Sequence, residues 1–519
     1  ETAEEQTPLQ KELARLANRL AVFVLASCIV LFAIGMLIGE SFVSMLTTAV
    51  AIAVSAIPEG MVVSLTVILA LGMQRIMKKH AIVRRLVAAE TLGSVTTICV
   101  DKTGTITQGT MKVVKEDLAN PEQAIMAAAL ANDLSEPLEV ALWDWVLTKD
   151  HLDPQQLSEQ EKRLGEIPFD ARYKYMAVET QKGIWIKGAP EVLLELSTCS
   201  LRERGRWMEK IHEFAREGLR TLAFGFLPSK KGKLRTGDIE KISFLGLVGI
   251  SDPVRPGVAA AIARVKAAGI NVKIITGDYR DTAQSVLRSI GIALLHPEEE
   301  IIEGKELDHI SDALLRERVG HLELFCRVTP EQKHRIVGAL QSIGEVVAMT
   351  GDGVNDAPAL KKADIGIVVV GASDVARDTA DLVLLDSNFE TIVGAVEEGR
   401  GMFENIRKVV LYLLSDAFVE MSLILFSILL RLPLPLIPLQ ILWINLIDDG
   451  LPSLALTADP PDHDLMRLRP RPKNASIIDP YVRTLIILIS AFTVVFVLGV
   501  YIYVLKTGFS LDYGRTLVF

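Results

Sequence analysis

The segment Ile98–Gly109, ICVDKTGTITQG, places one carboxylate directly after an apolar run. The apolar run predicts a buried strand, so Asp101 would stand at its tip with small polar residues following it. A carboxylate at a strand tip can act as a nucleophile and form an aspartyl-phosphate. The segment therefore predicts phosphoryl transfer to Asp101.

Two further polar motifs also follow short apolar runs. TGD, at Thr276–Asp278, comes after NVKII, and TGDGVND, at Thr350–Asp356, comes after EVVAM. A single TGD is also typical of a simple turn, but three such motifs in this order favour one phosphoryl-transfer site. Asp352 could share Mg²⁺ with Asp101, because Mg²⁺ prefers a few carboxylates plus phosphate oxygens. Donors to the phosphoryl oxygens could come from Thr276, Gly277 and Lys333.

The elements that carry these motifs alternate in type along the chain. Helix-like runs such as VAAAIARVKAAG and RDTAQSVLRSIG separate the strand-like runs, which predicts a parallel sheet covered by helices. Ligands of such sheets bind at the carboxyl ends of the strands, so the three motifs should meet at one edge. The stretch Met111–Ser243 lacks this alternation and is expected to be a second domain inserted into the first.

Apolar segments long enough to cross a bilayer flank this middle part. Half of the residues are hydrophobic and mean hydropathy is +0.33, yet 23% are charged, so the two kinds must be segregated along the chain. Five spans are predicted, with part of a sixth from Tyr513 onward: Leu20–Gly39, Phe42–Met73, Val409–Leu430, Leu436–Leu456 and Leu485–Val504.

Charge and cysteine content exclude several classes. Basic residues follow the second span and precede the third, which places the large middle part in the cytoplasm. The net charge of −9 argues against nucleic-acid binding. The four cysteines form no close pair, so neither a disulfide framework nor a zinc site is expected.

The second span is interrupted by Pro58-Glu59-Gly60 in VSAIPEGM. Pro58 has no N–H, so the carbonyl of Val54 loses its usual helical partner. Broken helices with free carbonyls form ion sites in transporters. A proline kink without a ligand is the alternative, and Glu59 argues against it.

Later spans carry further carboxylates. Asp416 and Glu420 lie four residues apart and share a helix face. The next span holds Asn445, Asp448 and Asp449. Carboxylates inside a membrane are costly and mark ion pathways. An oxygen-rich site favours Ca²⁺ and similar hard cations over copper or zinc.

DKTGT, KGAP, DPVR, TGD, TGDGVNDAP and PEG together resemble the P-type cation-transporting ATPases, most closely type II pumps such as the calcium ATPases. The resemblance covers nearly the whole chain. It implies a multidomain α-helical membrane protein with a cytosolic α/β phosphorylation domain, similar to haloacid dehalogenase hydrolases with a Rossmann-type parallel sheet, and an inserted α+β nucleotide-binding domain. The implied domains are membrane helices and stalk at 1–92, phosphorylation at 93–110 and 244–400, nucleotide binding at 111–243, and C-terminal membrane helices at 401–519.

The resemblance also implies roles for particular residues. Catalytic residues would be Asp101, Lys102, Thr103, Thr276, Gly277, Asp278, Lys333, Asp352, Asn355 and Asp356. Mg²⁺ would be held by Asp101, Thr103 and Asp352. ATP would be bound by Glu139, Phe169, Lys174, Lys187, Gly188, Arg220, Asp252 and Arg255. The transported ion would be bound by Val54, Ile57, Glu59, Asp416, Glu420, Asn445, Asp448 and Asp449.

Some positions depart from the calcium pump or allow a simpler interpretation. Ala171 stands where that pump has a basic residue, which would weaken nucleotide binding. Taken singly, Phe169 is interpreted as a core aromatic and Lys187 as a solvated lysine. Asp416 and Asp448 replace a serine and a threonine, and Ala417 replaces an asparagine ligand. The ion site is therefore more acidic, and proton countertransport or another cation stays open.

Thr103 separates a pump from a phosphatase of the same superfamily. Such phosphatases carry a second aspartate two positions after the nucleophile, and a threonine hydroxyl cannot replace it as an acid and base near neutral pH. The expected activity is therefore ATP-driven transport through a persistent phosphoenzyme, with Ca²⁺ as the first choice. The alternatives are another cation (H⁺, Na⁺/K⁺, Mg²⁺ or Mn²⁺), a membrane-tethered phosphatase or phosphate sensor, and an inactive regulatory homologue.

Family members also carry two earlier spans and an actuator domain with a TGE motif. No TGE occurs in this sequence, so we expect a large fragment that binds nucleotide without completing a transport cycle alone. The expected partners are ATP, the transported cation and membrane lipid, without nucleic acid; protein partners are unknown. The expected location is a multi-pass position in the cell membrane with cytoplasmic catalytic domains.

Overall fold

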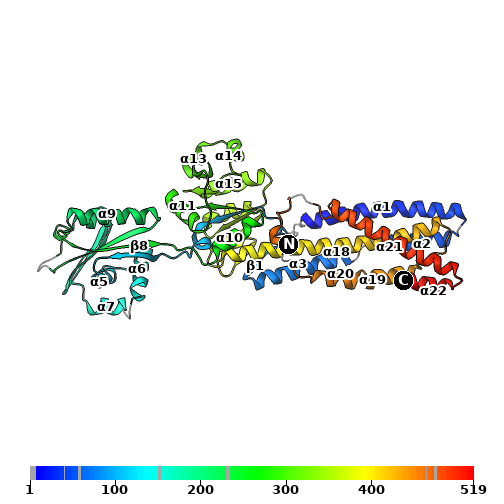
Figure 1. Cartoon of the computed structure of the whole chain (residues 1–519), viewed down its shortest axis with the longest axis horizontal. Coiled ribbons are helices and arrows are strands. Elements are labelled where there is room, and N and C mark those ends of the chain that lie inside the picture. The colour runs from blue at the N-terminus through cyan, green and yellow to red at the C-terminus, as the bar shows by residue number, and fades with distance from the viewer. Residues whose placement is uncertain are drawn as a thin grey trace.

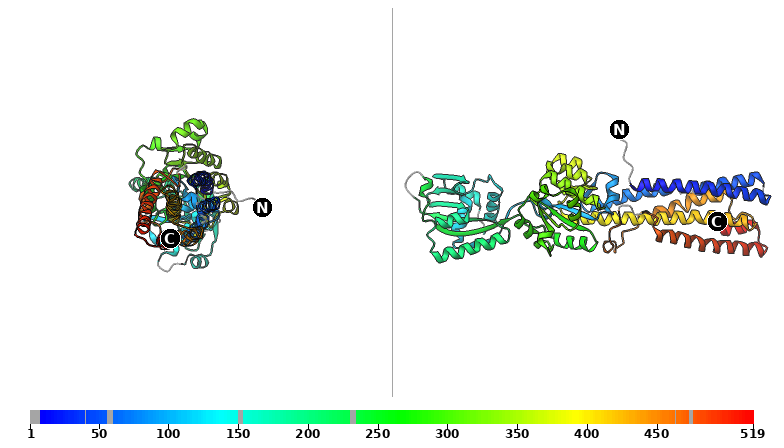
Figure 2. Two further views of the ribbon diagram at one scale, coloured as in Figure 1. Left: turned by 90° about the vertical axis from the view of Figure 1, so that its right-hand side faces the viewer. Right: turned by 90° about the horizontal axis from the view of Figure 1, so that it is seen from above.

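The computed structural model describes residues 8–39, 41–55, 60–149, 153–229, 234–462, 464–472 and 476–519. The described chain is elongated, with two sheet-containing units in line and a group of long helices at the opposite end (Figures 1 and 2). This arrangement confirms the predicted fold class, because it joins a mostly parallel sheet, a separate antiparallel sheet and membrane-length helices in one chain.

The first unit is built on an eight-stranded sheet in the order β1-β14-β13-β12-β2-β9-β11-β10. All neighbours pair in parallel except β1 with β14. The strands are β1 (Ala81–Val83), β2 (Thr97–Asp101), β9 (Asn271–Ile275), β10 (Ile301–Glu303), β11 (Leu324–Cys326), β12 (Val347–Gly351), β13 (Ile365–Val369) and β14 (Leu382–Leu384).

Helices connect these strands as the alternating pattern predicts. They are α4 (Leu86–Leu92), α10 (Val258–Ala267), α11 (Arg280–Ser289), α12 (Pro297–Glu300), α13 (Gly304–His309), α14 (Asp312–Arg318), α15 (Pro330–Ser342), α16 (Ala357–Lys362) and α17 (Asp374–Thr379). β2, β9 and β12 are almost entirely buried, because a parallel sheet is covered on both faces.

The second unit is an antiparallel sheet in the order β3-β8-β7-β6-β5-β4. Its strands are β3 (Lys112–Leu118), β4 (Gly165–Asp170), β5 (Tyr175–Thr180), β6 (Gly183–Gly188), β7 (Arg220–Leu227) and β8 (Ser243–Ser251). Its helices are α5 (Pro121–Leu130), α6 (Pro137–Leu147), α7 (Pro154–Gln160), α8 (Pro190–Glu195) and α9 (Leu201–Arg216). Neighbouring residues of β7 alternate between two cores, since Ala223 packs with Trp207 of α9 and Phe224 with Trp145 of α6.

Three elements differ from the domain limits expected from sequence. β8 pairs with β3 and β7, so residues 244–251 lie in the second sheet and not in the phosphorylation domain. β1 joins the first sheet, although residues up to 92 were assigned to membrane and stalk. α18 (Phe389–Leu429) is one helix of 41 residues that continues across the expected limit at 400.

The remaining helices form the membrane part. They are α1 (Pro8–Ile38), α2 (Phe42–Ser55), α3 (Gly60–Lys78), α19 (Pro438–Ile447), α20 (Gly450–Thr457), α21 (Pro480–Lys506) and α22 (Leu511–Val518). Among the described residues, four stretches are long and apolar enough to span a membrane: Ala21–Ile38, Gly60–Lys78, Phe389–Leu429 and Pro480–Lys506. The predicted span Leu436–Leu456 is instead divided between α19 and α20.

Candidate functional site: a phosphoryl-transfer edge and a carboxylate-lined membrane cavity

The structure brings the three polar motifs to one edge of the first sheet. β2 lies between β12 and β9, and all three run parallel. Asp101 pairs in register with Ile275, so Thr276 begins just beyond the tip of β2. Asp352 directly follows Gly351, the last residue of β12. The carboxyl ends of adjacent parallel strands thus supply the groups that were predicted to converge.

Asp101 is held by a buried lysine. Lys333 Nζ donates to Asp101 Oδ2 at 2.5 Å and to Asp356 Oδ1 at 2.7 Å. The N–H of Asp101 donates to the Thr350 hydroxyl at 2.8 Å. Lys333 lies on α15, whose first turn is closed by a capping box between Thr329 and Gln332. One ammonium group therefore fixes the direction of the candidate nucleophile.

Three carboxylates at this edge form a cluster that fits a hard divalent cation. One oxygen from each of Asp101, Asp352 and Asp356 lies within 4.8 Å of the others. Burial raises the pKa of Asp101, and the charges of Asp356 and Asp352 raise it too, although Lys333 opposes them. Burial and Asp356 raise the pKa of Asp352 as well. One lysine cannot neutralise the charge of three carboxylates, so the cluster keeps excess negative charge. Oxygen ligands with excess negative charge suit Mg²⁺.

The other predicted catalytic residues surround this cluster. Lys102 Nζ forms an ion pair with Asp278 Oδ2 at 2.5 Å, and the N–H of Asp278 donates to the Thr276 hydroxyl at 3.1 Å. Lys102 and Thr276 are buried. Thr103, Gly277 and Asn355 are exposed at this edge. The predicted Mg²⁺ set omitted Asp356, which the structure places inside the carboxylate cluster.

Asp252 and Arg255 hold the loop that follows Asp101. Asp252 accepts hydrogen bonds from the Thr107 hydroxyl at 2.5 Å and from the Gly109 N–H at 2.8 Å. The Arg255 guanidinium donates to the carbonyls of Gly104, Thr107 and Gln108. These contacts sit where β3 and β8 leave the second unit, so the two side chains brace the connection between the units.

In the second unit, Lys187 and Glu139 form a buried ion pair. Lys187 Nζ lies 2.7 Å from Glu139 Oε1, and Glu139 also accepts from the N–H and hydroxyl of Ser135. Burial lowers the pKa of Lys187, although Glu139 opposes it. Lys187 is 4% exposed and Phe169 is 54% exposed. The simpler interpretations are therefore wrong, because the lysine is not solvated and the aromatic is not in the core.

The predicted nucleotide residues gather at one end of the second sheet. Tyr175 pairs with Gly188, and Gly188 pairs with Ala223, so the start of β5, the end of β6 and the start of β7 coincide. A Cβ on Gly188 would lie 2.6 Å from the Lys174 carbonyl oxygen, so the close approach requires glycine. This end carries Phe169, Lys174, Lys187, Gly188 and Arg220. It is also the end from which the chain crosses to the first unit, at Lys112 and Ser251.

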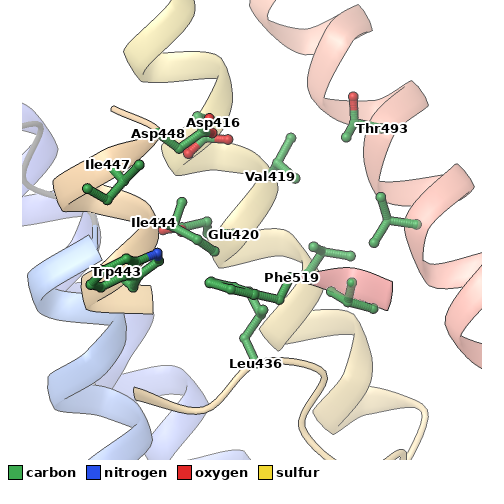
Figure 3. Close-up of a pocket in the computed structure, with 13 residues that line it drawn as sticks. Asp416, Val419, Glu420, Leu436, Trp443, Ile444, Ile447, Asp448, Thr493 and Phe519 are labelled. Atoms are coloured by element: carbon green, nitrogen blue, oxygen red, sulfur yellow. The ribbon is translucent and has the colours of Figure 1, made fainter. Parts of the chain in front are cut away.

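A cavity of about 360 Å³ lies between α18, α19, α21 and α22 (Figure 3). Asp416 and Glu420 reach it from α18, and Asp448 reaches it from the end of α19. Asp416 and Asp448 lie side by side in Figure 3, near the level of Val419. Three of the carboxylates predicted to bind the transported ion thus share one space.

The helix break beside this cavity has a defined geometry. The N–H groups of Asp448 and Asp449 both donate to the Ile444 carbonyl, at 2.8 and 3.2 Å, so α19 ends in a wider turn. The Tyr412 hydroxyl donates to the Asp448 carbonyl at 2.9 Å. The Asp449 carbonyl oxygen would lie 3.3 Å from a Cβ on Gly60, so the break packs against the start of α3.

Several oxygens of this region have no protein partner. Within the described ranges, Asp416 Oδ2, Asn445 Oδ1 and Asp449 Oδ1 are buried without a hydrogen-bond partner. Ile57 and Glu59 lie outside the described residues, and the side chain of Val54 is likewise not described. Oxygens buried without partners carry a free-energy cost that a bound cation would remove.

Sequence reasoning missed four residues of these sites. Thr350 receives the N–H of the nucleophile, and Tyr412 donates to the helix break. Trp443 and Thr493 line the membrane cavity. Thr493 is one of few polar residues in the mostly apolar α21, and this was an available signal, because polar groups in membrane helices face the protein interior.

Comparisons with known proteins agree with this arrangement. Residues 95–364, more than half of the chain, match the haloacid dehalogenase-like hydrolases, and residues 433–519 match the C-terminus of cation transporting ATPases. Calcium-transporting ATPase 1 of Bacillus cereus is 40% identical over 92% of this chain and 58% of its own length. Calcium-transporting ATPase 1 of Saccharomyces cerevisiae is 36% identical over 91% of the chain and 56% of its own length.

A cation-transporting ATPase of Synechocystis is 36% identical over 98% of the chain and 63% of its own length. The chain thus spans less than two thirds of these relatives. The strand-tip aspartate with its lysine, the carboxylate cluster and these matches lead to one assignment: the chain belongs to the haloacid dehalogenase-like hydrolases and, within them, to the type II P-type cation-transporting ATPases.

Proposed function

We propose that this chain drives a hard cation, Ca²⁺ in the first place, across a membrane by forming an aspartyl-phosphate on Asp101. The observation that carries the proposal is the geometry of Asp101, held at 2.5 Å by Lys333 and within 4.8 Å of two further carboxylates. The names of the relatives, which are calcium-transporting ATPases, favour Ca²⁺.

The reaction requires in-line attack. Oδ1 or Oδ2 of Asp101 forms a bond to the γ-phosphorus of ATP, the bond from that phosphorus to the β,γ-bridging oxygen breaks, and ADP leaves with the electron pair. Lys333 and the backbone around Thr276 stabilise the charge that develops on the equatorial oxygens. Asp101, Asp352 and Asp356 would hold Mg²⁺, which neutralises phosphate charge when bound.

The phosphoenzyme should be long-lived within this chain. Thr103 is exposed two residues after the nucleophile, and its hydroxyl is neither a general acid nor a general base near neutral pH. This residue argues against the phosphatase alternative. The covalent state would therefore hold one membrane conformation until hydrolysis releases it.

ATP would bind at the end of the second sheet that carries Phe169, Lys174 and Lys187. The exposed ring of Phe169 can stack on the adenine, and Lys174 offers positive charge to the phosphates. The buried Lys187–Glu139 pair would shape the base of the pocket and would not bind phosphate, since the two side chains form an ion pair with each other. Asp252 and Arg255 would act as the brace between units and not as nucleotide ligands.

The transported ion would bind beside α18, α19 and α20. Asp416, Glu420 and Asp448 would supply oxygens from the cavity, and Asn445 and Asp449 would supply oxygens that are buried without a hydrogen-bond partner among the described residues. This set is hard and strongly acidic, which suits Ca²⁺. The adjacent carboxylates Asp416 and Asp448 also favour a second candidate, another hard cation or a proton carried by the same mechanism.

The test is phosphoenzyme formation from γ-labelled ATP with Mg²⁺ present, each candidate cation being titrated separately. Acid-stable label on the protein that depends on Ca²⁺ and disappears in Asp101→Asn supports the proposal. Label that follows a different cation keeps the mechanism and reassigns the cargo. Absence of label with every cation, while the protein remains folded, contradicts the proposal.

A further inference from the structure

The two sheet-containing units also touch each other away from the strands that connect them. The hydroxyl of Ser285, on α11 of the first unit, donates to the Glu217 carbonyl at the end of α9 in the second unit, at 2.7 Å (Figure 1). The connecting strands β3 and β8 meet the second unit at Lys112 and Ser251. A unit that is joined through two strands can rotate about them, so a contact elsewhere restricts the angle between the units.

The end of α9 is shaped for this close approach. Gly218 follows the last turn with φ of +76°, the left-handed conformation in which many helices end. A Cβ on Gly218 would lie 3.0 Å from the Ser285 Cβ and 3.6 Å from the Thr282 Cα. A larger residue would therefore push α11 away, so both the turn and the neighbouring unit favour glycine here.

Lys115 fixes the end of α9 to one of the connecting strands. Its Nζ, on β3, lies 2.8 Å from Glu213 Oε1 and 2.7 Å from Glu217 Oε1. The same ammonium lies 4.9 Å from the centroid of the Phe214 ring. Glu217 thus has its side chain bound within the second unit and its carbonyl bound to the first, so Ser285 contacts a part of the second unit that is itself held in place.

Each side of the contact leads to residues of the candidate sites. Ser285 lies seven residues after Asp278, which corresponds to about 10 Å along a helix. Arg220 lies two residues after Gly218 and therefore at most about 7 Å from it. The contact consequently keeps the start of β7, at the predicted nucleotide end of the second sheet, on the side of the first unit that carries the TGD motif.

We propose that Ser285 is a positioning residue, whose hydrogen bond to Glu217 holds the second unit at the angle from which bound ATP reaches Asp101. A single exposed hydrogen bond is weak enough to form and break in every reaction cycle. The inference rests on the proposed function, because it requires ATP in the second unit and phosphoryl transfer to Asp101. It adds the contact that orients one unit toward the other.

The first experiment compares two phosphoryl donors on the whole chain with Mg²⁺ present. Initial rates of phosphoenzyme formation are measured with γ-labelled ATP and with labelled acetyl phosphate, which has no nucleoside and releases acetate when Asp101 is phosphorylated. Ser285→Ala should slow labelling from ATP about two- to tenfold, the factor that one exposed hydrogen bond supplies. The half-saturating ATP concentration and the rate with acetyl phosphate should not change, because neither depends on the angle between the units.

Matched variants separate positioning from a general disturbance of α11. The Ser289 hydroxyl donates to the Val286 carbonyl within the same helix at 2.7 Å, so Ser289→Ala should react like the wild type with both donors. Ser285→Thr keeps a hydroxyl and should label from ATP at close to the wild-type rate. Gly218→Ala should slow labelling from ATP from the opposite side of the contact. Its combination with Ser285→Ala should be no slower than the slower single variant, because both remove one contact.

A second measurement follows the angle between the units directly. Spin labels on Arg202→Cys, exposed on α9, and on Arg316→Cys, exposed on α14, report the distance between the two units. The chain without the two added cysteines gives the background from native thiols. Ser285→Ala should broaden the distribution of label distances, whereas Ser289→Ala should leave it as in the wild type.

Several results would overturn the inference. Wild-type or faster labelling of Ser285→Ala from ATP would show that the contact does not assist phosphoryl transfer. An equal loss with acetyl phosphate would show a disturbance of the first unit, and an unchanged distribution of label distances would show that the contact does not set the angle. Failure of the proposed function is distinguishable, since the wild type would then take label from neither donor, while Ser285→Ala would still alter the label distances. That result would overturn the role of Ser285 in phosphoryl transfer as well.

Discussion

The phosphoryl-transfer edge and the membrane carboxylates differ in how their negative charge is balanced. At the edge, Asp101 and Asp356 share the ammonium of Lys333, and Lys102 is paired with Asp278. In the membrane part, Asp416 and Asp449 each keep a buried oxygen without a protein partner among the described residues. The edge is organised in advance by protein cations, whereas the membrane oxygens would, under the proposed function, be balanced by the transported cation.

The largest expected effect tests the paired side of this comparison. Lys333→Ala removes the ammonium from Asp101 and Asp356, so the rate of phosphoenzyme formation should fall by about 10²–10³-fold. The free energy of unfolding should also fall, by about 3–5 kcal/mol, because two buried carboxylates lose their partner. Initial rates with labelled ATP and urea unfolding of the same preparation measure the two effects.

Lys266→Ala is the control for this variant. Lys266 pairs with Glu323 on the surface of the same unit at 3.3 Å, and its loss should change stability by less than about 0.5 kcal/mol. Phosphorylation of Lys333→Ala at the wild-type rate would contradict the claim that Lys333 organises the carboxylates at the edge.

The next effect tests the unpaired side. Asp449→Asn removes a carboxylate whose buried Oδ1 has no partner among the described residues, so the half-saturating cation concentration for phosphorylation should rise by at least about tenfold, equivalent to ~1.4 kcal/mol. Without cation, the same variant should melt at a higher temperature than the wild type, because a neutral amide is cheaper to bury than a carboxylate.

Asp512→Asn provides the matched control, since the Asp512 side chain is 93% exposed at the start of α22. Neither its cation dependence nor its melting temperature should change. A lower melting temperature for cation-free Asp449→Asn would mean that Asp449 already has a protein partner. The contrast between paired carboxylates at the edge and unpaired ones in the membrane part would then be wrong.

The smallest expected effect concerns the buried ion pair between Lys187 and Glu139, which lies far from the proposed metal sites in sequence and in a different unit. Glu139→Gln leaves Lys187 buried without its counter-charge, so the free energy of unfolding should fall by about 1–3 kcal/mol at neutral pH. Burial already lowers the pKa of Lys187, and loss of Glu139 lowers it further. Between that lowered pKa and the ordinary value of 10.5, the unfolded chain binds more protons, so stability rises with pH.

Thermal melting from neutral to alkaline pH checks this expectation. The deficit of Glu139→Gln relative to the wild type should shrink as the pH increases. A deficit that stays constant would show that the loss comes from packing or from the Ser135 hydrogen bonds instead of from the lysine charge.

Much of the phosphoryl-transfer edge was predictable because its order follows from strand periodicity. Asp101, Thr276 and Asp352 follow apolar runs, and parallel strands place such residues at one edge. The pairing of Lys333 with Asp356 was not predictable, because it depends on how α15 packs. The roles of Asp252 and Arg255 also depend on contacts that sequence spacing does not contain.

The limits of the second unit and the membrane helices were harder to predict for different reasons. β8 is a continuous buried strand, and only its partners show which sheet it joins. The division between α19 and α20 occurs at residues with helical φ and ψ, and the available signal was Pro452, which has no N–H to donate to the Asp448 carbonyl. The expected limits at 243 and 400 therefore fell within β8 and α18 instead of between elements.

The uninterrupted length of α18 has a mechanical consequence. The helix begins at Phe389 against the first sheet and carries Asp416 and Glu420 in the membrane part, with no break in its hydrogen bonding (Figure 1). From Phe389 to Glu420 it is a stiff rod about 45 Å long, so a tilt of about 5° at one end displaces the other by about 4 Å. A displacement of that size exceeds the length of a cation–oxygen bond, so a small rotation of the first unit would be enough to pull Asp416 and Glu420 away from the cation that the proposed function assigns to them.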